Sequence, residues 1–174
     1  GPDRGLFPLP KGILGAQCEL VFRLGRVFPA DGEAIDRAAA ADAIVAVQPA
    51  IGLLGRRTIH PPRNDLGALA DFALHVFTLC GPHAAAPDLA ALDRVPVVAR
   101  IDGQEVARAT AAATLGHPLD AVAWLAGELA AQGERLNAGD LVATGSCTPI
   151  LQVLPGQHLE ADFGPLGQAR AGFL

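Results

Sequence analysis

Apolar residues in this chain gather in short runs punctuated by glycine and proline, a distribution typical of short, buried strands. The clearest example is a predicted hairpin, in which residues 95–101 and 104–110 flank an Asp102-Gly103 turn that tolerates positive φ. Residues 72–80 are apolar without clear alternation, which predicts a strand buried on both faces. Further strands are predicted over residues 18–24, 140–145, 150–154, 158–163 and 168–173.

Two segments carry the apolar periodicity of helices. The first is predicted to begin at an Asp31 cap and to run to Ala46, with Pro49 as its stop. The second opens at Pro118, carries one apolar stripe and ends at a Gly133 cap. The order of elements does not alternate strand and helix regularly, which argues against a doubly wound nucleotide-binding sheet. These patterns predict an α+β, β-dominated mixed fold with two main helices.

Composition narrows the class of protein. The 174 residues are 51% hydrophobic and 18% charged, enough for one globular domain with a substantial core. The net charge is −5 and no run of Lys or Arg occurs, so neither nucleic acid nor an anionic membrane is expected as a partner. No apolar run is long enough to cross a bilayer, and no signal peptide is evident. Three cysteines without paired spacing are most consistent with a reducing cytoplasm.

The start of the chain differs from the rest in composition. Glycine and proline are frequent over residues 1–16, which predicts an irregular lead-in. Gly1-Pro2, in a chain without methionine, is interpreted as a cleavage scar. Residues 17–174 are expected to form a single catalytic-type domain.

The last third of the chain carries an ordered series of motifs. Leu-Gly-His-Pro-Leu begins at Leu115, Gly139-Asp140 follows the second predicted helix, and Thr144-Gly145-Ser146 comes next. In this order the motifs resemble the hydratase and decarboxylase branch of the fumarylacetoacetate hydrolase superfamily. The resemblance implies the fold of that family's C-terminal domain, a homo-oligomer, and action on a small keto acid held by a divalent metal. Family members usually carry a further N-terminal portion that this sequence lacks, so the chain is expected to be either a fragment or a shortened member of the family.

The resemblance also aligns three positions with the family's metal ligands. The family's Glu-x-Glu pair corresponds to Gln17 and Glu19, and its third acid corresponds to Gly52. Because Mg²⁺ requires several oxygen ligands, no tightly bound cofactor is expected, with Mg²⁺ or Mn²⁺ as the cation if any binds. Glu19 is interpreted as a weak remnant of the metal site or as a catalytic acid. A salt-bridged acid beside Arg23 or Arg56 is an equal alternative.

Other candidate residues follow from the same alignment. Asp71 is retained from the family's Ala-Asp-Asn-Ala-Ser segment, whereas Phe72 and Leu74 replace polar residues and predict a more apolar wall. Asp71 is a candidate for proton transfer, and a simple loop acid is the safer interpretation. Thr144, Gly145 and Ser146 are candidate substrate-binding residues because hydroxyl and N–H groups at a strand end can bind a carboxylate or keto oxygen. A tight strand exit explains them equally well.

Histidines and cysteines add no separate site. The five histidines show no spacing typical of metal ligands. His117 is predicted to shape the start of the second helix, and His75 is predicted to be a hydrogen-bonded core residue. Cys147 has no His or Asp in a recognisable relation to it, so an inert thiol is favoured.

Two functions remain open from the sequence. The resemblance implies a lyase-like enzyme of hydratase or decarboxylase type, in which Glu19 or Asp71 moves protons and Thr144 and Ser146 stabilise an enolate without a metal. The alternative is a catalytically silent family member with a ligand-binding, partner-subunit or structural role. The loss of acids at Gln17 and Gly52 supports this alternative.

Overall fold

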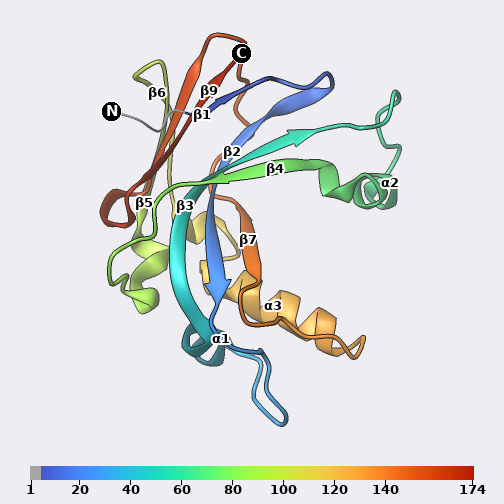
Figure 1. Ribbon diagram of the computed structural model, residues 1–174, viewed down its shortest axis with the longest axis vertical. Helices are drawn as coiled ribbons and strands as arrows, with labels where there is room; N and C mark the ends of the chain where they lie inside the picture. The colour runs from blue at the N-terminus through green and yellow to red at the C-terminus, as the bar shows by residue number, and fades with distance from the viewer. Residues whose placement is uncertain (1–4) are drawn as a thin grey trace.

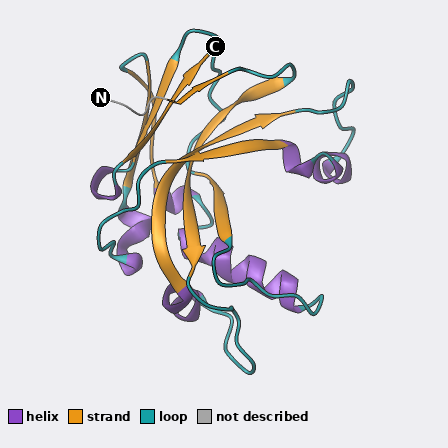
Figure 2. Cartoon of the chain, in the orientation of Figure 1, coloured by secondary structure: helices purple, strands orange, loops and turns teal. Residues whose placement is uncertain are grey.

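Two β-sheets pack against each other, and the helices lie at their margins, as the computed structural model of residues 5–174 shows in Figures 1 and 2. One sheet has the strand order β1-β9-β8-β5-β6 and the other the order β4-β3-β2-β7. Neighbouring strands are antiparallel except β1 and β9, which are parallel. The strands are β1 (Gly5–Phe7), β2 (Ile13–Leu24), β3 (Ile44–Gly55), β4 (His75–Cys80), β5 (Pro96–Ile101), β6 (Gln104–Thr110), β7 (Leu141–Ser146), β8 (His158–Asp162) and β9 (Gln168–Phe173). The α-helices are α1 (Arg37–Ala43), α2 (Asp65–Ala70) and α3 (Pro118–Ala130).

The long strands β2 and β3 form the centre of the molecule. β2 pairs with β3 on one side and β7 on the other, and β3 also contacts β8 and β9 of the other sheet. Because these strands are covered on both faces, their apolar residues run without alternation. The core contains Phe22 and Leu20 of β2, Ile51 and Leu53 of β3, and Phe163 after β8.

The strongest local signals in the sequence are confirmed. β5 and β6 form the expected hairpin around Asp102-Gly103. α3 begins at Pro118 as predicted, and the ring of His117 caps it, with Nδ1 accepting a hydrogen bond of 3.2 Å from Leu119 N. Gly133 adopts φ +78° just after this helix, a conformation that favours glycine. The β-dominated α+β fold with two main helices, α1 and α3, is confirmed.

The prediction of a helix from Asp31 to Ala46 is wrong. Only Arg37–Ala43 is helical, and Asp36 caps it by accepting from Ala39 N at 2.9 Å. The chain then enters β3, because β-branched residues 44, 45 and 47 suit a strand and β2 offers a complete partner. Pro49 lies inside β3 and does not end a helix, contrary to the prediction. Its nitrogen, which has no hydrogen to donate, faces the same side of β3 as its carbonyl. That carbonyl accepts from Gly81 N just beyond the end of β4, so the missing donor falls where the ladder with β4 stops.

Two further predictions, an irregular segment before residue 17 and a strand over residues 150–154, differ from the structure. Within residues 5–16, predicted to be irregular, the structure contains β1 and the first part of β2, while Gly1-Pro2 lies outside the described residues. Residues 150–154 do not form the predicted strand, and only Leu151 makes a single bridge, to Ala16. Leu151 and Val153 are buried and their neighbours exposed, so the alternation reflects burial of an extended segment rather than strand pairing.

The predicted strand over residues 72–80 begins later than expected. Phe72–Leu74 form a short 3₁₀ turn, and β4 starts at His75. β4 is an edge strand, so its residues are only partly buried and the prediction of burial on both faces is wrong. His75 is exposed, which also overturns its assignment to the core. Along residues 5–174, no helix combines the length and apolar character needed to cross a membrane.

The central position of β2 leads to a stability prediction. Phe22 is fully buried, so Phe22→Ala removes a ring from the core and is expected to lower the free energy of unfolding by about 3–5 kcal/mol. Ile59 is 94% exposed, and Ile59→Ala is the matched control, expected to change stability by less than about 0.5 kcal/mol. Urea unfolding followed by circular dichroism measures both. Equal stability losses in the two variants would contradict this description of the core.

Candidate functional site

Strands β2 and β3 bring together the three positions aligned with the family's metal ligands. Gln17 and Gly52 are direct partners across the two strands, and Glu19 lies two residues further along β2 on the same face. A Cβ built at Gly52 would lie 2.5 Å from Glu19 Oε1 and 3.2 Å from Gln17 Cγ. The three residues are therefore immediate neighbours, although far apart in sequence.

The carboxyl group of Glu19 is buried and hydrogen-bonded. Glu19 is only 2% exposed and lies in the middle of β2, between the buried residues Cys18 and Leu20. Thr78 Oγ1 donates to Oε1 at 2.9 Å, and Gln17 Nε2 donates to Oε2 at 3.2 Å. Among the described residues, no ion pair joins Glu19 to Arg23, Arg56 or any other cation. The salt-bridged interpretation of Glu19 thus lacks a partner.

Burial is the main influence on the protonation of this carboxyl group. It raises the pKa of Glu19, because the charged form loses its hydration. The hydrogen bond from Thr78, the nearby His75, the hydrogen bond from Gln17 and the main chain of Gly145 oppose that rise without cancelling it. A carboxyl with a raised pKa holds its proton to a higher pH than an ordinary glutamate, which favours a role in proton transfer.

Strand β4 contributes two polar residues that the sequence alone did not identify with this site. Thr78 is the register partner of Gly52, which directs its hydroxyl toward Glu19. His75 Nε2 lies 2.9 Å from Thr78 Oγ1, so a continuous chain of hydrogen bonds runs from exposed His75 to buried Glu19. An irregularity in the β3–β4 register, between Leu53 and Leu54, separates the pairing positions of His75 and Phe77. Only the strand register reveals this connection.

The predicted substrate-binding triplet lies beside Glu19 on β7. Ser146 is the register partner of Glu19, and Gly145 adopts φ +90° next to it. The hydroxyl of Thr144 donates to Leu20 O at 3.1 Å, and the hydroxyl of Ser146 donates to the carbonyl of Thr148. Both hydroxyls are engaged by the main chain, so the triplet faces the site mainly through its backbone.

Asp71 lies at the end of α2 and is hydrogen-bonded to Arg57. The Arg57 main-chain N–H donates to Asp71 Oδ2 at 2.9 Å, and the Arg57 guanidinium lies 3.3 Å from Oδ1. The main-chain hydrogen bond and the charge of Arg57 hold the pKa of Asp71 below its usual range despite burial. Phe72 is 73% exposed with the Arg57 guanidinium 5.0 Å from its ring centroid, and Leu74 is half-buried. Asp71 is therefore ionised, and it accepts hydrogen bonds from Arg57 rather than contacting Glu19.

The cysteines near Glu19 are buried thiols. Burial raises the pKa of Cys18 to about 12 and also raises the pKa of Cys147. Because the thiolate is the reactive form, both side chains are unreactive near neutral pH. The prediction of an inert Cys147 agrees with this environment.

The donor set does not fit a hard divalent cation. Mg²⁺ and Ca²⁺ bind groups of oxygen ligands, usually with more than one carboxylate. Here Glu19 supplies one carboxyl whose two oxygens already accept hydrogen bonds, Gln17 supplies an amide, and Gly52 supplies no side chain. Within residues 5–174, no group of three or more His, Cys, Asp and Glu side chains converges to hold a metal.

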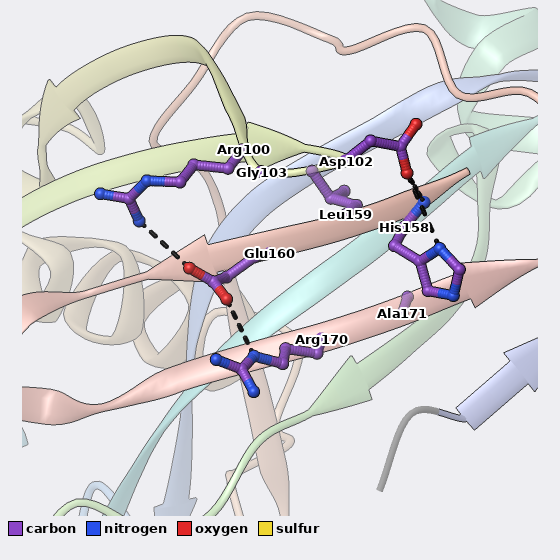
Figure 3. Close-up of a pocket in the computed structure, with 8 residues that line it drawn as sticks. All are labelled: Arg100, Asp102, Gly103, His158, Leu159, Glu160, Arg170 and Ala171. Atoms are coloured by element: carbon purple, nitrogen blue, oxygen red, sulfur yellow. Dashed lines mark hydrogen bonds and ion pairs between the residues drawn. The ribbon is translucent and has the colours of Figure 1, made fainter.

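A cleft of about 450 Å³ lies elsewhere, on the five-stranded sheet (Figure 3). Arg100 and Arg170 flank Glu160 and bond it at 3.1 and 2.9 Å, and His158 lies beside Asp102 at the other end. Each arginine is thus already neutralised by a carboxylate. The cleft is lined by charged residues that pair with one another on the surface of the sheet. Glu19, the candidate catalytic residue from the sequence, does not line it.

Comparison with known proteins identifies the family. The model of the fumarylacetoacetate hydrolase C-terminal domain matches residues 7–173. This chain belongs to the fumarylacetoacetate hydrolase family. A 2-keto-4-pentenoate hydratase of Paraburkholderia xenovorans is 30% identical over 157 residues, which cover 90% of this chain and 58% of the hydratase. A 4-oxalocrotonate decarboxylase of Pseudomonas putida is 32% identical over 136 residues, which cover 76% of this chain and 52% of the decarboxylase.

A solved structure supports the same branch of the family. The 4-oxalocrotonate decarboxylase of Pseudomonas putida G7, complexed with magnesium and adipate, superposes with a TM-score of 0.89 at 27% identity. The match covers 99% of this chain and 65% of that one. The chain thus spans a little over half the length of these curated relatives and about two thirds of the solved one.

The raised pKa of Glu19 predicts how stability depends on pH. A carboxyl whose pKa is higher in the folded state contributes most stability below its unfolded pKa, and this contribution is lost as pH rises through the folded pKa. Glu19→Gln keeps the shape but cannot ionise, so its stability relative to the wild type should increase as the pH rises above 4.5, the ordinary pKa of glutamate. Chemical unfolding of both proteins across this range measures the difference. A constant difference would contradict a raised pKa.

Proposed function

We propose that this chain is a lyase-type member of its family that acts on a small 2-keto or enol acid, with Glu19 as the residue that transfers protons. The observation that carries the proposal is a single buried and hydrogen-bonded carboxyl with a raised pKa, at the position where the family alignment expects chemistry. The relatives named as 2-keto-4-pentenoate hydratase and 4-oxalocrotonate decarboxylase support the class of substrate.

The proposed chemistry follows from the state of that carboxyl. Hydration or decarboxylation of a keto acid passes through an enol or enolate, and both require a proton to be moved to or from the substrate. In its protonated form, Glu19 donates its proton to the carbon of the developing enolate. In decarboxylation its carboxylate then regains a proton from solvent, and in hydration it takes the proton of the attacking water, whose hydroxide adds to the substrate double bond. The main-chain groups around Gly145 and Ser146 are proposed to hold the substrate oxygen, since the hydroxyl of Thr144 is committed to Leu20.

Asp71 has a supporting role in this proposal. Its two carboxylate oxygens accept hydrogen bonds from Arg57, and its lowered pKa keeps it ionised. It is therefore better suited to fixing the loop around Arg57 than to delivering a proton. Of the two acids suggested by the sequence, Glu19 is the stronger candidate for catalysis.

The oligomeric state, the cellular location and the extent of the domain remain part of the proposal. A homo-oligomer, a cytoplasmic location and a single catalytic-type domain over residues 17–174 stay predictions from the sequence. No tightly bound cofactor is proposed, and Mg²⁺ or Mn²⁺ is the cation to test. The solved relative's complex with magnesium and adipate makes both a cation and a dicarboxylate relevant probes.

Turnover of a keto-acid panel tests the proposal. The panel includes 2-keto-4-pentenoate and 4-oxalocrotonate, with and without Mg²⁺ or Mn²⁺, and is followed by loss of the substrate's ultraviolet absorbance. Glu19→Gln is expected to reduce kcat by about 10²–10⁴-fold, because general acid–base catalysis contributes that much. Glu105→Gln on β6 is the control, since Glu105 pairs with Arg108 on the surface away from Glu19. Full activity of Glu19→Gln would exclude the proposed role.

A catalytically silent family member is the alternative function. The replacement of two aligned ligands by Gln17 and Gly52 favours it, as does the engagement of both Glu19 oxygens by protein donors. A silent member is expected to turn over none of the panel while still binding a dicarboxylate such as adipate in calorimetry. Turnover that depends on Glu19 would rule out this alternative.

A further inference from the structure

The Glu19 carboxyl group occupies the space beside Gly52. A side chain at position 52 would begin 2.5 Å from Glu19 Oε1, so the Glu19 carboxyl fills the room that such a side chain needs. Gln17 Cγ closes the same space at 3.2 Å. The carboxyl is thus not left next to a void after the loss of an acid at position 52.

Protein donors hold the carboxyl in that space. Thr78, opposite Gly52 in the register, donates to Oε1 at 2.9 Å, and Gln17 donates to Oε2 at 3.2 Å. His75 Nε2 lies 2.9 Å from the Thr78 hydroxyl and links the set to the surface. Buried polar groups need partners, and this set satisfies both oxygens of Glu19 without a cation.

We propose that the Gln17–Glu19–Thr78–His75 hydrogen-bond set has replaced the divalent cation of the family, with Gly52 as the position that decides between the two arrangements. Thr78 and Gln17 act as positioning residues that fix the Glu19 carboxyl through their donors. An acid at position 52 would displace that carboxyl, break its bond to Thr78 and restore anionic oxygens around a shared centre. The present position of the Glu19 carboxyl and an acidic side chain at position 52 therefore exclude each other sterically.

Cation binding is the first test, and it uses the full chain. Mn²⁺ titration is followed by electron paramagnetic resonance and calorimetry on the wild type and on the double variant Gln17→Glu/Gly52→Glu. The wild type is expected to show no stoichiometric site, and the double variant is expected to bind Mn²⁺ at least about 10-fold more tightly. A tight wild-type site that Glu19→Gln abolishes would overturn the proposal, as would a folded double variant with no gain in affinity.

A second test does not depend on the double variant folding. The ¹³C resonance of the Glu19 carboxyl carbon, assigned with Glu19→Gln, reports on its hydrogen bonds at fixed pH. Thr78→Val and Gly52→Ala are each expected to shift this resonance, and Thr78→Ser is expected to restore it because it keeps the donor. Gly127→Ala is the matched control, since a Cβ there meets nothing within 4 Å. An unchanged resonance in Thr78→Val and Gly52→Ala would refute the positioning role.

The inference rests on the same Glu19 site as the proposed function, but the two can fail separately. Cation affinity and the carboxyl resonance are measured without substrate. A wild type that binds no Mn²⁺ and turns over no keto acid would support the replacement of the cation while contradicting the lyase proposal. A wild type that requires bound Mn²⁺ for turnover would do the opposite.

Discussion

Burial of the Glu19 carboxyl in the middle of β2 is the constraint on which the candidate site depends. At 2% exposure the group has lost its water, and an isolated buried charge is strongly unfavourable. Burial raises the pKa of the carboxyl group, and the hydrogen bonds donated by Thr78 and Gln17 offset part of the cost of its charged form. Those donors come from β4 and β2, so the strand register that aligns them is as important as the residues themselves.

The two-sheet architecture makes this burial possible. β2 lies between β3 and β7, and β3 packs on β8 and β9, so Glu19 at the centre of β2 is buried, while Thr78 and His75 connect it by hydrogen bonds to the surface. The same packing raises the pKa values of Cys18 and Cys147 and makes these thiols unreactive. Glu19 is the one carboxylic acid of β2. Under the proposed replacement, a fold shared with a decarboxylase complexed with magnesium holds this carboxyl with protein donors instead of a cation.

Local chemistry explains which parts of the fold were predictable from the sequence. The β5–β6 hairpin and α3 follow from signals carried by adjacent residues: an Asp102-Gly103 turn, Pro118 at the helix start and Gly133 after its end. The segment after Ala43 was mispredicted as helix because the helical spacing of the preceding alanines was extended to Ala46, whereas the β-branched Ile44 and Val47 pair with β2. Residues 150–154 were mispredicted as a strand because alternating burial does not require a ladder.

The candidate site was predictable only in part. The family alignment identified Gln17, Glu19 and Gly52, and the β2–β3 register brings them into contact. Thr78 and His75 had no signal in the sequence, because their relation to Glu19 depends on the β3–β4 register and its irregularity. The hydroxyls of Thr144 and Ser146 attracted attention as possible substrate ligands, yet each donates to a main-chain carbonyl. The bond from Thr144 to Leu20 is a tertiary contact, and the bond from Ser146 to Thr148 depends on the local backbone conformation, so the motif alone predicts neither.

The most direct test of this account is a pH titration of the Glu19 carboxyl carbon by ¹³C nuclear magnetic resonance in the full chain, with and without Mg²⁺. The account predicts a titration midpoint above that of an ordinary glutamate and no change when Mg²⁺ is added. A midpoint at or below the ordinary value, or one that falls sharply with Mg²⁺, would contradict it. The second result would mean that a cation, rather than Thr78 and Gln17, holds the carboxylate.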